Sequence, residues 1–243
     1  MELKVIKTGS KGNAYLLSHD DQQLLLDAGA RYGDIMQALG FWSRGLLGAL
    51  ITHEHQDHSK AVDSLLKHGF AVYGSQGTSH KLQATLALVK PHETQKIGNW
   101  SVLPFLVEHD AREPVGYLLY HAGTQAKILY LTDTHFCRYC FVGLTHILIE
   151  CNHCEDIIFD QLDNGYLDRE LFFRIKQTHL SLGRVKEFLR SCDLSCCRKI
   201  ILIHLSDENS NERRMVREIS DLTGIETIAA HDGQVFDFDL CPF

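Results

Sequence analysis

The sequence predicts an α+β protein in which helices cover the faces of sheets. Two observations lead to this fold class: short apolar runs typical of strands alternate with helical patterns, and one pair of strands is joined by a hairpin-like turn instead of a crossover helix. The 243 residues are 44% hydrophobic, which is enough to bury a core, and they contain no internal repeat or Pro/Ser-rich linker. We therefore expect a single domain that spans residues 1–243.

Short apolar segments bounded by turn residues are expected to form the strands. They span residues 23–27, 48–52, 71–73, 100–108, 115–120, 127–133, 146–150, 200–204 and 234–238. The segments 115–120 and 127–133 flank the turn 121–126, so these two are predicted to form the hairpin.

Helical periodicity marks four further segments, at about residues 59–68, 78–89, 182–192 and 211–222. The last two each place apolar residues on one helical face. These residues are Leu182, Val185, Phe188 and Leu189 in the first, and Met215, Ile219 and Leu222 in the second. Gly69 and Gly224 stand where left-handed helix ends are expected.

The charge balance excludes general electrostatic binding of nucleic acid. There are 24 Lys+Arg against 31 Asp+Glu, so the net charge is -7, and any phosphate-binding role needs a local source of positive charge. No apolar run approaches the roughly 20 residues that span a bilayer. The first residues lack a cationic leader followed by an apolar stretch. We expect a cytoplasmic protein that does not contact a membrane.

Polar residues that can bind metals or move protons follow or end several of the expected strands. They are Asp27, His53, Asp133, Glu150 and His204. Residues at strand ends are held by a rigid scaffold and face open space, where α/β proteins carry out chemistry. The pattern therefore predicts a functional site at the ends of these strands.

The most informative motif, THEHQDH, occupies residues 52–58. In an extended segment His53, His55 and Asp57 share one face, and His58 can turn toward it as the next helix begins. Four potential ligands within so short a loop suit two cations better than one tetrahedral site. The alternative is a solvated polar turn with Asp57 near the helix cap, but three imidazoles beside a carboxylate are costly to bury without a cation.

Two cations need more ligands than this loop supplies, and later strands offer them. His109 follows the segment 100–108, Asp133 ends 127–133, and His204 ends 200–204. Each alone is more typical of a hydrogen-bonded edge residue, but together with the loop they favour a metal site.

In this order, the motifs resemble those of the metallo-β-lactamase fold superfamily over nearly the whole chain. That family carries a strand-terminal Asp, an HxHxDH loop, and then a His, an Asp and a final His. The resemblance implies an αββα four-layer sandwich, in which two facing sheets lie between helices and the metals lie at one edge.

The same resemblance implies a role for each of these residues. One metal would be held by His53, His55 and His109, and the other by Asp57, His58 and His204, with Asp133 bridging the two. Asp27 would orient the loop through a hydrogen bond to a ligand.

Some branches of the superfamily fit less well. Flavin-linked diiron oxidases have a Glu where this chain has His55, and secreted β-lactamases need a signal peptide. Thioesterases of the glyoxalase type usually carry a helical C-terminal extension, for which little chain remains after His204.

Further marks resemble the YycJ/WalJ-type group, bacterial and phage metallohydrolases proposed to act as 5′-to-3′ exonucleases. The marks lie at residues 9–13 (GSKGN), 109–110 with 114–117, 150–153 (ECNH), 178–181 (THLS) and 204–209 (HLSDEN). Ser10 and Asn13 belong to a glycine-rich turn that either brings backbone close to the site or simply joins two strands. Asn152 and His153 either contact substrate or form edge hydrogen bonds.

The THLS segment also resembles the loop that opens a helix in PhnP-like and tRNase Z-like phosphodiesterases. This implies that His179 contacts the scissile phosphate and protonates the leaving oxygen. A helix N-terminus at Ser181 would add backbone N–H groups there. Alternatively, Ser181 is a simple N-cap and His179 an exposed neighbour. The long substrate-binding arm of tRNase Z is missing, which argues against tRNA maturation.

These residues together predict a dinuclear metal-dependent hydrolase of phosphodiester bonds, a nuclease on DNA ends or single strands. Two divalent ions about 3.5–4 Å apart would turn a bridging water into the attacking hydroxide. The expected catalytic residues are His179 and Asp57, and ligands without thiolate suit zinc or manganese. The alternatives are a hydrolase of small esters, thioesters or lactams with the same metals, and an inactive scaffold, which the complete ligand set disfavours. No protein partner can be inferred.

The eight cysteines are expected to be reduced thiols. The spacing Cys137-x2-Cys140 and Cys151-x2-Cys154 leaves a four-thiolate zinc site open as an alternative. An apparent strand lies between the two pairs, which a compact zinc knuckle does not normally contain.

Overall fold

The computed structural model describes residues 1–40 and 43–239, and the chain forms two compact units. The first unit consists of residues 1–106, 111–126 and the chain from 230 onward, and the second of residues 107–110 and 127–229. Each unit is described below by itself. That residues 1–243 form one domain stays a prediction.

The first unit contains a mixed seven-stranded sheet in the order β14-β1-β2-β3-β4-β5-β6. Its strands are β1 (Glu2–Lys7), β2 (Ala14–His19), β3 (Gln22–Leu26), β4 (Leu46–Leu50), β5 (Val72–Gly74), β6 (Ala87–Leu88) and β14 (Val235–Asp237). Strands β14, β1, β2 and β3 pair antiparallel, and β3 to β6 pair parallel. The parallel part places the ends of β3 and β4 side by side, so the residues that follow them meet at one edge.

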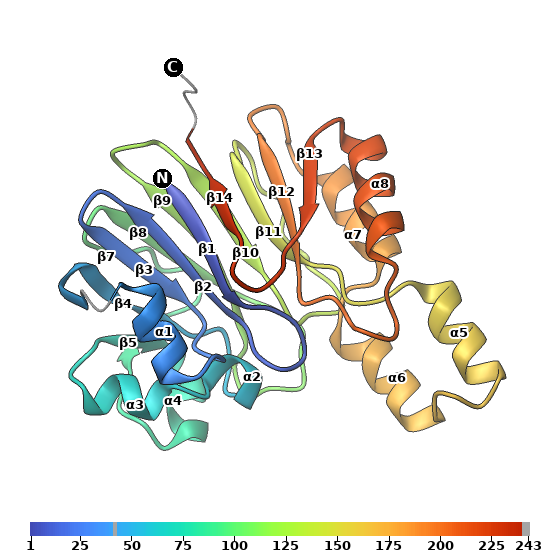
Figure 1. Cartoon of the computed structure of the whole chain (residues 1–243), viewed down its shortest axis with the longest axis horizontal. Coiled ribbons are helices and arrows are strands. Elements are labelled where there is room, and N and C mark those ends of the chain that lie inside the picture. Colours follow the sequence, from blue (N-terminus) through green and yellow to red (C-terminus); the bar gives the residue numbers. More distant parts are fainter. Residues whose placement is uncertain (41–42, 240–243) are drawn as a thin grey trace. The chain divides into compact units, whose positions relative to one another are not determined.

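Helices cover one face of this sheet (Figure 1). They are α1 (Tyr32–Ala38), α2 (Gln56–Ser59), α3 (Val62–Lys67) and α4 (Gln76–Leu82), with the short 3-10 helix η1 (Ser43–Gly45) before β4. Ile35 of α1 and Leu65 of α3 pack against Leu16, Leu25 and Ala49 of the sheet in one buried cluster. Alternate strand residues thus face the helices, which fixes the register of the sheet.

Three antiparallel strands complete the first unit: β7 (Gln95–Ile97), β8 (Trp100–Leu106) and β9 (Val115–His121). They are tied to the sheet beyond β4, because the Tyr117 hydroxyl donates to the carbonyl of Ile51 at 2.7 Å and the Val115 N–H to that of Thr52 at 3.0 Å. These bonds fix the backbone immediately before the histidine-rich loop.

The second unit contains four parallel strands in the order β13-β12-β11-β10. They are β10 (Lys127–Leu131), β11 (His146–Glu150), β12 (Lys199–Ile203) and β13 (Glu226–Ala229). Strands β10 to β12 are almost entirely buried, as expected for parallel strands covered on both faces. Because the strands are parallel, their carboxyl ends lie at one edge.

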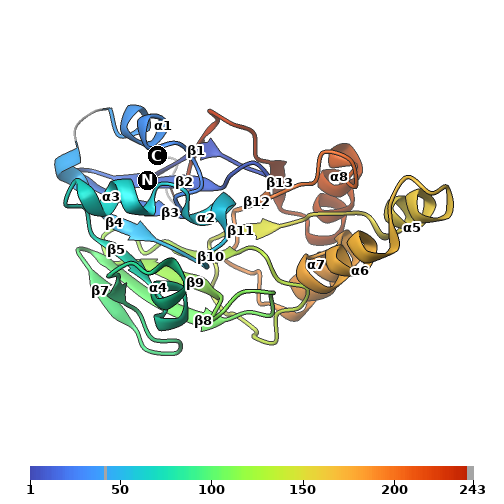
Figure 2. The ribbon, with the colours of Figure 1, turned by 90° about the horizontal axis from the view of Figure 1, so that it is seen from below.

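The helices of this unit are α5 (Glu155–Asp163), α6 (Arg169–Thr178), α7 (Leu182–Ser191) and α8 (Glu212–Thr223). Helix α7 buries the four apolar residues that the sequence predicts, and α8 buries Met215 and Ile219 while Leu222 is half-buried. Helix α5 lies beside α6, and the two share a buried cluster around Ile158 and Phe172 (Figure 2). Helix α6 ends immediately before His179, so its packing positions that residue.

All of the predicted strands are present, with ends displaced by at most two residues. The turn of the predicted hairpin closes with a hydrogen bond from the His121 N–H to the carbonyl of Ala126 at 2.9 Å. Gly69 and Gly224 have φ of 80° and 70°, as the predicted helix ends require. None of the helices in the described part of the chain is long and apolar enough to cross a membrane.

Two helix predictions are wrong in part. A helix already begins at Gln56, so Asp57 and His58 lie on its first turn and not in an extended segment or a following loop. The segment predicted as a helix at 78–89 is helical only to Leu82, because Gln83 adopts a left-handed conformation that ends the helix, and β6 follows. The sequence analysis also missed β1, β2, β6, β7, β13, α1, α5 and α6.

Candidate metal centre

In the first unit, the histidine-rich loop is held against two other segments by backbone hydrogen bonds. The Asn13 N–H donates to the carbonyl of Asp57 at 2.7 Å, and the Ala28 N–H to that of His58 at 2.8 Å. A Cβ on Gly29 would lie 1.7 Å from the Asp57 carbonyl oxygen, so only glycine allows this approach. The loop is therefore fixed by its own backbone before any ligand binds.

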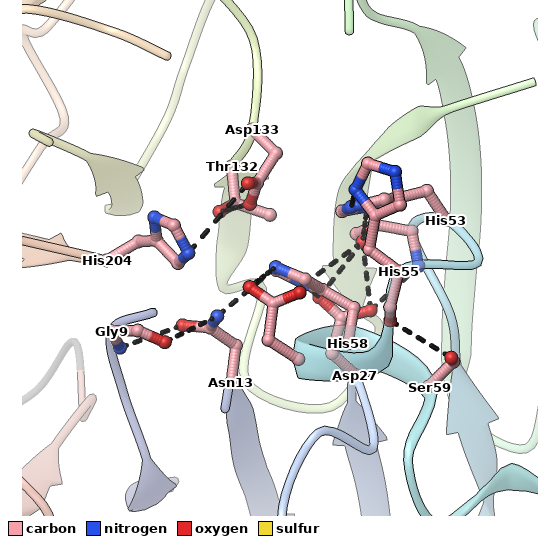
Figure 3. A network of polar contacts seen from close by, with 12 residues as sticks. Gly9, Asn13, Asp27, His53, His55, His58, Ser59, Thr132, Asp133 and His204 are labelled. Atoms are coloured by element: carbon pink, nitrogen blue, oxygen red, sulfur yellow. Dashed lines mark hydrogen bonds and ion pairs between the residues drawn. The ribbon is translucent and has the colours of Figure 1, made fainter. Parts of the chain in front are cut away.

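Three imidazoles lie together in this loop (Figure 3). The ring centroid of His53 is 4.7 Å from that of His55 and 4.3 Å from that of His58. Nε2 of His53 lies 3.1 Å from Nδ1 of His55. The three rings therefore present their nitrogens to a small common space, as ligands of metal ions do. Asp57, the fourth predicted ligand of the loop, has Oδ2 at 3.4 Å from Nε2 of His58.

Asp27 lies fully buried behind the loop. Its Oδ1 accepts hydrogen bonds from the N–H of Thr52 at 2.7 Å and from its hydroxyl at 3.0 Å, and its Oδ2 lies 2.7 Å from Nδ1 of His58. A carboxylate only accepts, so Nδ1 of His58 donates and Nε2 carries the lone pair. This is the contact that the expected orienting role of Asp27 requires.

The glycine-rich turn contributes one of its two predicted site residues. Asn13 is buried, and its Nδ2 lies 3.2 Å from Nε2 of His58 and 3.1 Å from the carbonyl of Gly9 (Figure 3). Ser10 is exposed at the tip of the turn and does not reach this network. The turn therefore supports the loop mainly through Asn13 and its backbone.

In the second unit, side chains from the ends of three strands and of α6 converge. Four side chains each place one potential metal-ligand atom within 4.8 Å of the others: Asp133, Glu150, His179 and His204. All of them except His179 are buried. Thr132 donates its hydroxyl hydrogen to Oδ2 of Asp133 at 2.6 Å (Figure 3). The strand ends thus gather carboxylates and imidazoles that lie far apart in the sequence.

Glu150 organises this group, and the sequence analysis assigned it no role. Its Oε1 lies 2.6 Å from Nδ1 of His179 and 3.0 Å from Nδ1 of His204, and its Oε2 accepts the N–H of Leu180 at 3.0 Å. The signal for Glu150 was present, since it ends a fully apolar strand. What the sequence does not show is that two histidines share this carboxylate.

Burial and charge act in opposite directions on Glu150 and His179. Burial raises the pKa of Glu150, but the charge of His179 together with the hydrogen bonds from His179 and His204 more than offsets this, so the pKa lies below its ordinary value. Burial lowers the pKa of His179, but the charge of Glu150 and the hydrogen bond to it raise the pKa above the ordinary value. The pair therefore favours a carboxylate beside a protonated imidazole.

His109 also faces Asp133 in the second unit. Its Nδ1 lies 3.0 Å from the carbonyl oxygen of Thr178, and its Nε2 lies 3.9 Å from Oδ1 of Asp133. Nε2 of His204 lies 3.8 Å from the same oxygen. Both nitrogen–oxygen distances are too long for hydrogen bonds. They match the separation of roughly 3–4 Å expected for two ligand atoms that each lie about 2 Å from the same cation. Burial lowers the pKa of His109, which favours the neutral ring.

Three of the histidines meet a test for metal ligands that depends only on hydrogen bonds. His109 has an oxygen beside each ring nitrogen, with the Thr178 carbonyl at Nδ1 and the Asp110 carboxylate 3.2 Å from Nε2. In the other three, Nδ1 of His58 and of His204 each lies next to a carboxylate oxygen, and Nδ1 of His53 lies 3.0 Å from the Thr52 hydroxyl. An imidazole whose Nδ1–H donates keeps its lone pair on Nε2. The donor set therefore fits divalent cations.

Three of these strand-end residues carry backbone strain. Asp27, Asp133 and His204 have φ of 55°, 47° and 53°, in the left-handed region that residues other than glycine rarely adopt. Such conformations persist where surrounding structure enforces them, and they cluster at functional sites. Here the strain turns each side chain out of its strand direction.

Asn152 and His153 follow Glu150 at the same strand end. Asn152 donates from Nδ2 to the carbonyl of His204 at 3.2 Å, so it makes the hydrogen bond expected of an edge residue. His153 is 2% exposed, and its Nδ1 has no hydrogen-bond partner. Burial lowers the pKa of His153 to about 4, so it is neutral at neutral pH.

The N-terminus of α7 is closed by the chain itself. Ser181 accepts the N–H of Arg184 at 3.2 Å as an N-cap and donates to Glu155, whose carboxylate also lies where a Cβ of Gly183 would stand. A carboxylate already occupies the end of the helix dipole. The expected phosphate position at Ser181 is therefore not open, and Ser181 is an N-cap. His179, in contrast, is not an exposed neighbour, because it is only 18% exposed and lies against Glu150.

The cysteines take no part in this centre. Of the eight, the seven within the described residues are free thiols, and Cys241 lies outside those residues. Among the described residues, the groups of side chains that could share a cation include no cysteine. Burial raises the pKa of Cys137 to about 11 and that of Cys151 well above its ordinary value, so both are protonated at neutral pH. The four-thiolate zinc site is not formed.

A protein-family model described as a beta-lactamase superfamily domain matches residues 24–205. Among curated proteins, the chain is 28% identical to "Exodeoxyribonuclease WalJ" of Streptococcus pneumoniae, over 94% of this chain and 88% of that protein. The match thus includes the histidine-rich loop and the later strand ends.

Solved structures with low identity have the same fold. The metallo-beta-lactamase fold protein YhfI from Bacillus subtilis superposes with a TM-score of 0.73 at 15% identity, over 97% of this chain and 99% of that one. A diphosphatase from the PhnP family gives a TM-score of 0.68 at 17% identity, over 97% and 96% of the two chains. The predicted metallo-β-lactamase-like α+β fold is confirmed.

Proposed function

This chain belongs to the β-lactamase superfamily, and on that premise we propose that it is a dinuclear metal-dependent nuclease that hydrolyses phosphodiester bonds at DNA ends or in single strands. The similarity to a protein named as an exodeoxyribonuclease supports this substrate class. The 5′-to-3′ polarity follows from the sequence resemblance and is part of the proposal.

We propose that the donor sets of the two units together hold the cations. One would be bound by His53, His55 and His109, and the other by Asp57, His58 and His204, with Asp133 between them. The tautomers that Asp27 fixes in His58 and Glu150 fixes in His204 support this, because each leaves the lone pair of the ring on Nε2, away from the carboxylate. Nitrogen and oxygen donors without thiolate suit zinc or manganese. Bound divalent cations would lower the pKa of water and neutralise charge on phosphate oxygens.

The observation that carries the phosphodiesterase proposal is the Glu150–His179 pair. Nδ1 of His179 lies 2.6 Å from the carboxylate of Glu150, which stabilises the imidazolium, and its side chain is 18% exposed, open enough to meet a substrate. An alkoxide is a poor leaving group and needs a proton, which an imidazolium can donate. A thiolate leaving group has no such need, since thiols ionise at a pKa of about 8.5. His179 therefore fits a phosphodiester better than a thioester.

Other site residues have smaller proposed roles. Asp57 is the candidate to accept the proton of the attacking water, because its side chain is more accessible than the buried carboxylates of Asp27 and Asp133. Asn152 would steady His204, and His153, which is 2% exposed, would support the strand end from within and not contact the substrate. We also propose that the protein acts in the cytoplasm, which cell fractionation tests.

Turnover assays with added manganese or zinc test the function. The substrates are 5′-labelled and 3′-labelled single-stranded and duplex oligonucleotides, bis-p-nitrophenyl phosphate and a small thioester. We expect release of mononucleotides from oligonucleotides and no thioester hydrolysis above background. Thioester turnover without phosphodiester cleavage would overturn the proposal in favour of a small-molecule hydrolase.

A further inference from the structure

A pocket of about 190 Å³ opens in the second unit between the segment after β10 and helix α7. Phe136, Leu180 and Phe188 supply its apolar walls, and Arg138, Arg184 and Glu187 stand around it. Ligand pockets for drug-sized molecules measure about 300–1,000 Å³, so this one suits a smaller flat group. No residue proposed above as a metal ligand or proton carrier lines it.

The two walls of the pocket are hydrogen-bonded, directly or through Thr134, to Glu150, the carboxylate that pairs with the proposed acid His179. Leu180 follows His179 directly, and its N–H donates to Oε2 of Glu150 at 3.0 Å. The hydroxyl of Thr134 donates to the carbonyl of Phe136 at 2.8 Å, and the N–H of Thr134 points to the same Glu150 oxygen at 3.4 Å. The backbone that carries both walls is thus bonded to Glu150. Leu180 comes one residue after His179, and Phe136 comes three residues after Asp133. The pocket is therefore linked to the proposed acid through Glu150 and one residue of backbone.

The chemistry of the pocket matches a nucleotide. Phe136 is 44% exposed, which leaves part of its ring open for stacking. Arg138 pairs with Glu108 and Arg184 with Glu187, but the arginine side chains are 63% and 53% exposed, so these ion pairs are weak and screened. Aromatic rings beside exposed arginines form the combination that binds single-stranded nucleic acid without reading its sequence.

We infer that this pocket receives the base of the nucleotide next to the cleaved phosphodiester bond, stacked on Phe136. Arg138 and Arg184 contact the adjoining phosphate. The inference rests on the proposed nuclease function and adds to it the preference for an unpaired end, because a base can enter the pocket only after leaving its stack. It also supplies positive charge to a chain with a net charge of -7.

The test compares Phe136→Ala with the wild type on two single-stranded oligonucleotides. One is unmodified, and the other carries an abasic residue in place of each terminal nucleotide. We expect kcat/KM of the variant to fall about tenfold on the unmodified strand, within the range of single base–aromatic contacts. On the abasic strand the variant and the wild type should agree within about twofold. An equal loss on both strands would overturn the inference, because the ring would then act on the backbone or on the fold.

Phe159→Ala is the matched control, since Phe159 lies on α5, outside the pocket, with the same exposed fraction as Phe136. A comparable loss in this variant would assign the effect to stability or to a different surface. Arg138→Gln together with Arg184→Gln should reduce the slope of log KM against log salt concentration. An unchanged slope would mean that Arg138 and Arg184 do not contact the phosphate.

A binding measurement separates failure of this inference from failure of the proposed function. If the wild type cleaves no oligonucleotide, the function is wrong. Calorimetric titration with deoxyadenosine 5′-monophosphate then still tests the pocket. We expect the wild type to bind about tenfold more tightly than Phe136→Ala, and equal affinities would overturn the inference.

Discussion

The two units hold their donor groups in different ways. In the first, four candidate ligands fall within residues 53–58, and backbone hydrogen bonds from Asn13 and Ala28 fix the loop. In the second, the candidate ligands His109, Asp133 and His204 are separated by many residues. The carboxylate of Glu150 there contacts His204 and the proposed acid His179. The candidate ligands of the first unit therefore form a local motif on a rigid backbone, whereas those of the second unit are brought together by the parallel strands.

This difference has a physical consequence. Backbone contacts to the loop in the first unit do not depend on the charge of any side chain, whereas the arrangement in the second depends on Glu150 remaining ionised between two imidazoles. We expect substitutions in the first unit to act mainly on metal affinity. Substitutions in the second should also change proton transfer and its pH dependence.

Asp133→Ala should have the largest effect of the predicted substitutions. Asp133 would contact both cations, so its loss should remove metal and lower turnover by at least about 10⁴-fold, because a bound metal lowers the pKa of water to about 7. Metal content by mass spectrometry and kcat on an oligonucleotide measure this. A variant that keeps its full metal content would contradict the bridging role.

His179→Ala should keep its metal and lose about 10²- to 10³-fold in kcat, the usual contribution of a general acid. A phosphodiester with a p-nitrophenolate leaving group should suffer less, since that group leaves without a proton. If the variant loses metal, His179 is a ligand and the division between ligands and acid is wrong.

Glu150→Gln should lower kcat by about 10- to 100-fold, the range for residues that orient a ligand through a hydrogen bond. Glu150 holds the pKa of His179 above its ordinary value, and the acid form of His179 is the active one. Removing the negative charge lowers this pKa, so activity should be lost on the alkaline side at a lower pH than in the wild type. An unchanged pH profile with reduced kcat would leave Glu150 with a purely structural role.

Asp27→Asn is the counterpart in the first unit. It removes the charge behind His58 while the backbone contacts of the loop remain, so metal affinity should fall only about tenfold. The pH profile should keep the wild-type shape. Competition with a chelator measures the affinity, and a displaced alkaline limb would contradict the contrast between the units.

Ser181→Ala should have the smallest effect. Ser181 caps α7, so the variant should lose about 1 kcal/mol of stability, seen as a lower midpoint of urea unfolding. Turnover should change by less than about twofold, since the end of α7 is already occupied by Glu155. A large loss of kcat with unchanged stability would mean that this hydroxyl meets the substrate.

The sequence was most informative about fold where strands are strongly apolar. The central strands β10, β11 and β12 were predicted within two residues because parallel strands buried on both faces read as continuous apolar runs. Strand β1 was missed because Lys4 and Lys7 interrupt its apolar pattern. Helix α6 was missed because Arg169, Arg174 and Lys176 surround its few buried residues.

The candidate site also has residues that could be predicted from the sequence and residues that could not. The ligands of the loop could be recognised because they share one short motif, whereas Glu150 has no neighbouring residue in the sequence that reveals its two partners. Its role depends on β11 lying between β10 and β12 and on α6 ending at His179, which are long-range features. The closed end of α7 was equally hidden, since Glu155 lies 26 residues before Ser181.

Anomalous scattering from crystals soaked in zinc or in manganese tests most directly whether both units supply ligands to a shared pair of ions. We expect two peaks about 3.5–4 Å apart, each bound by residues of the 53–58 loop and by at least one of His109, Asp133 and His204. A single peak, or peaks that contact only one unit, would contradict this account.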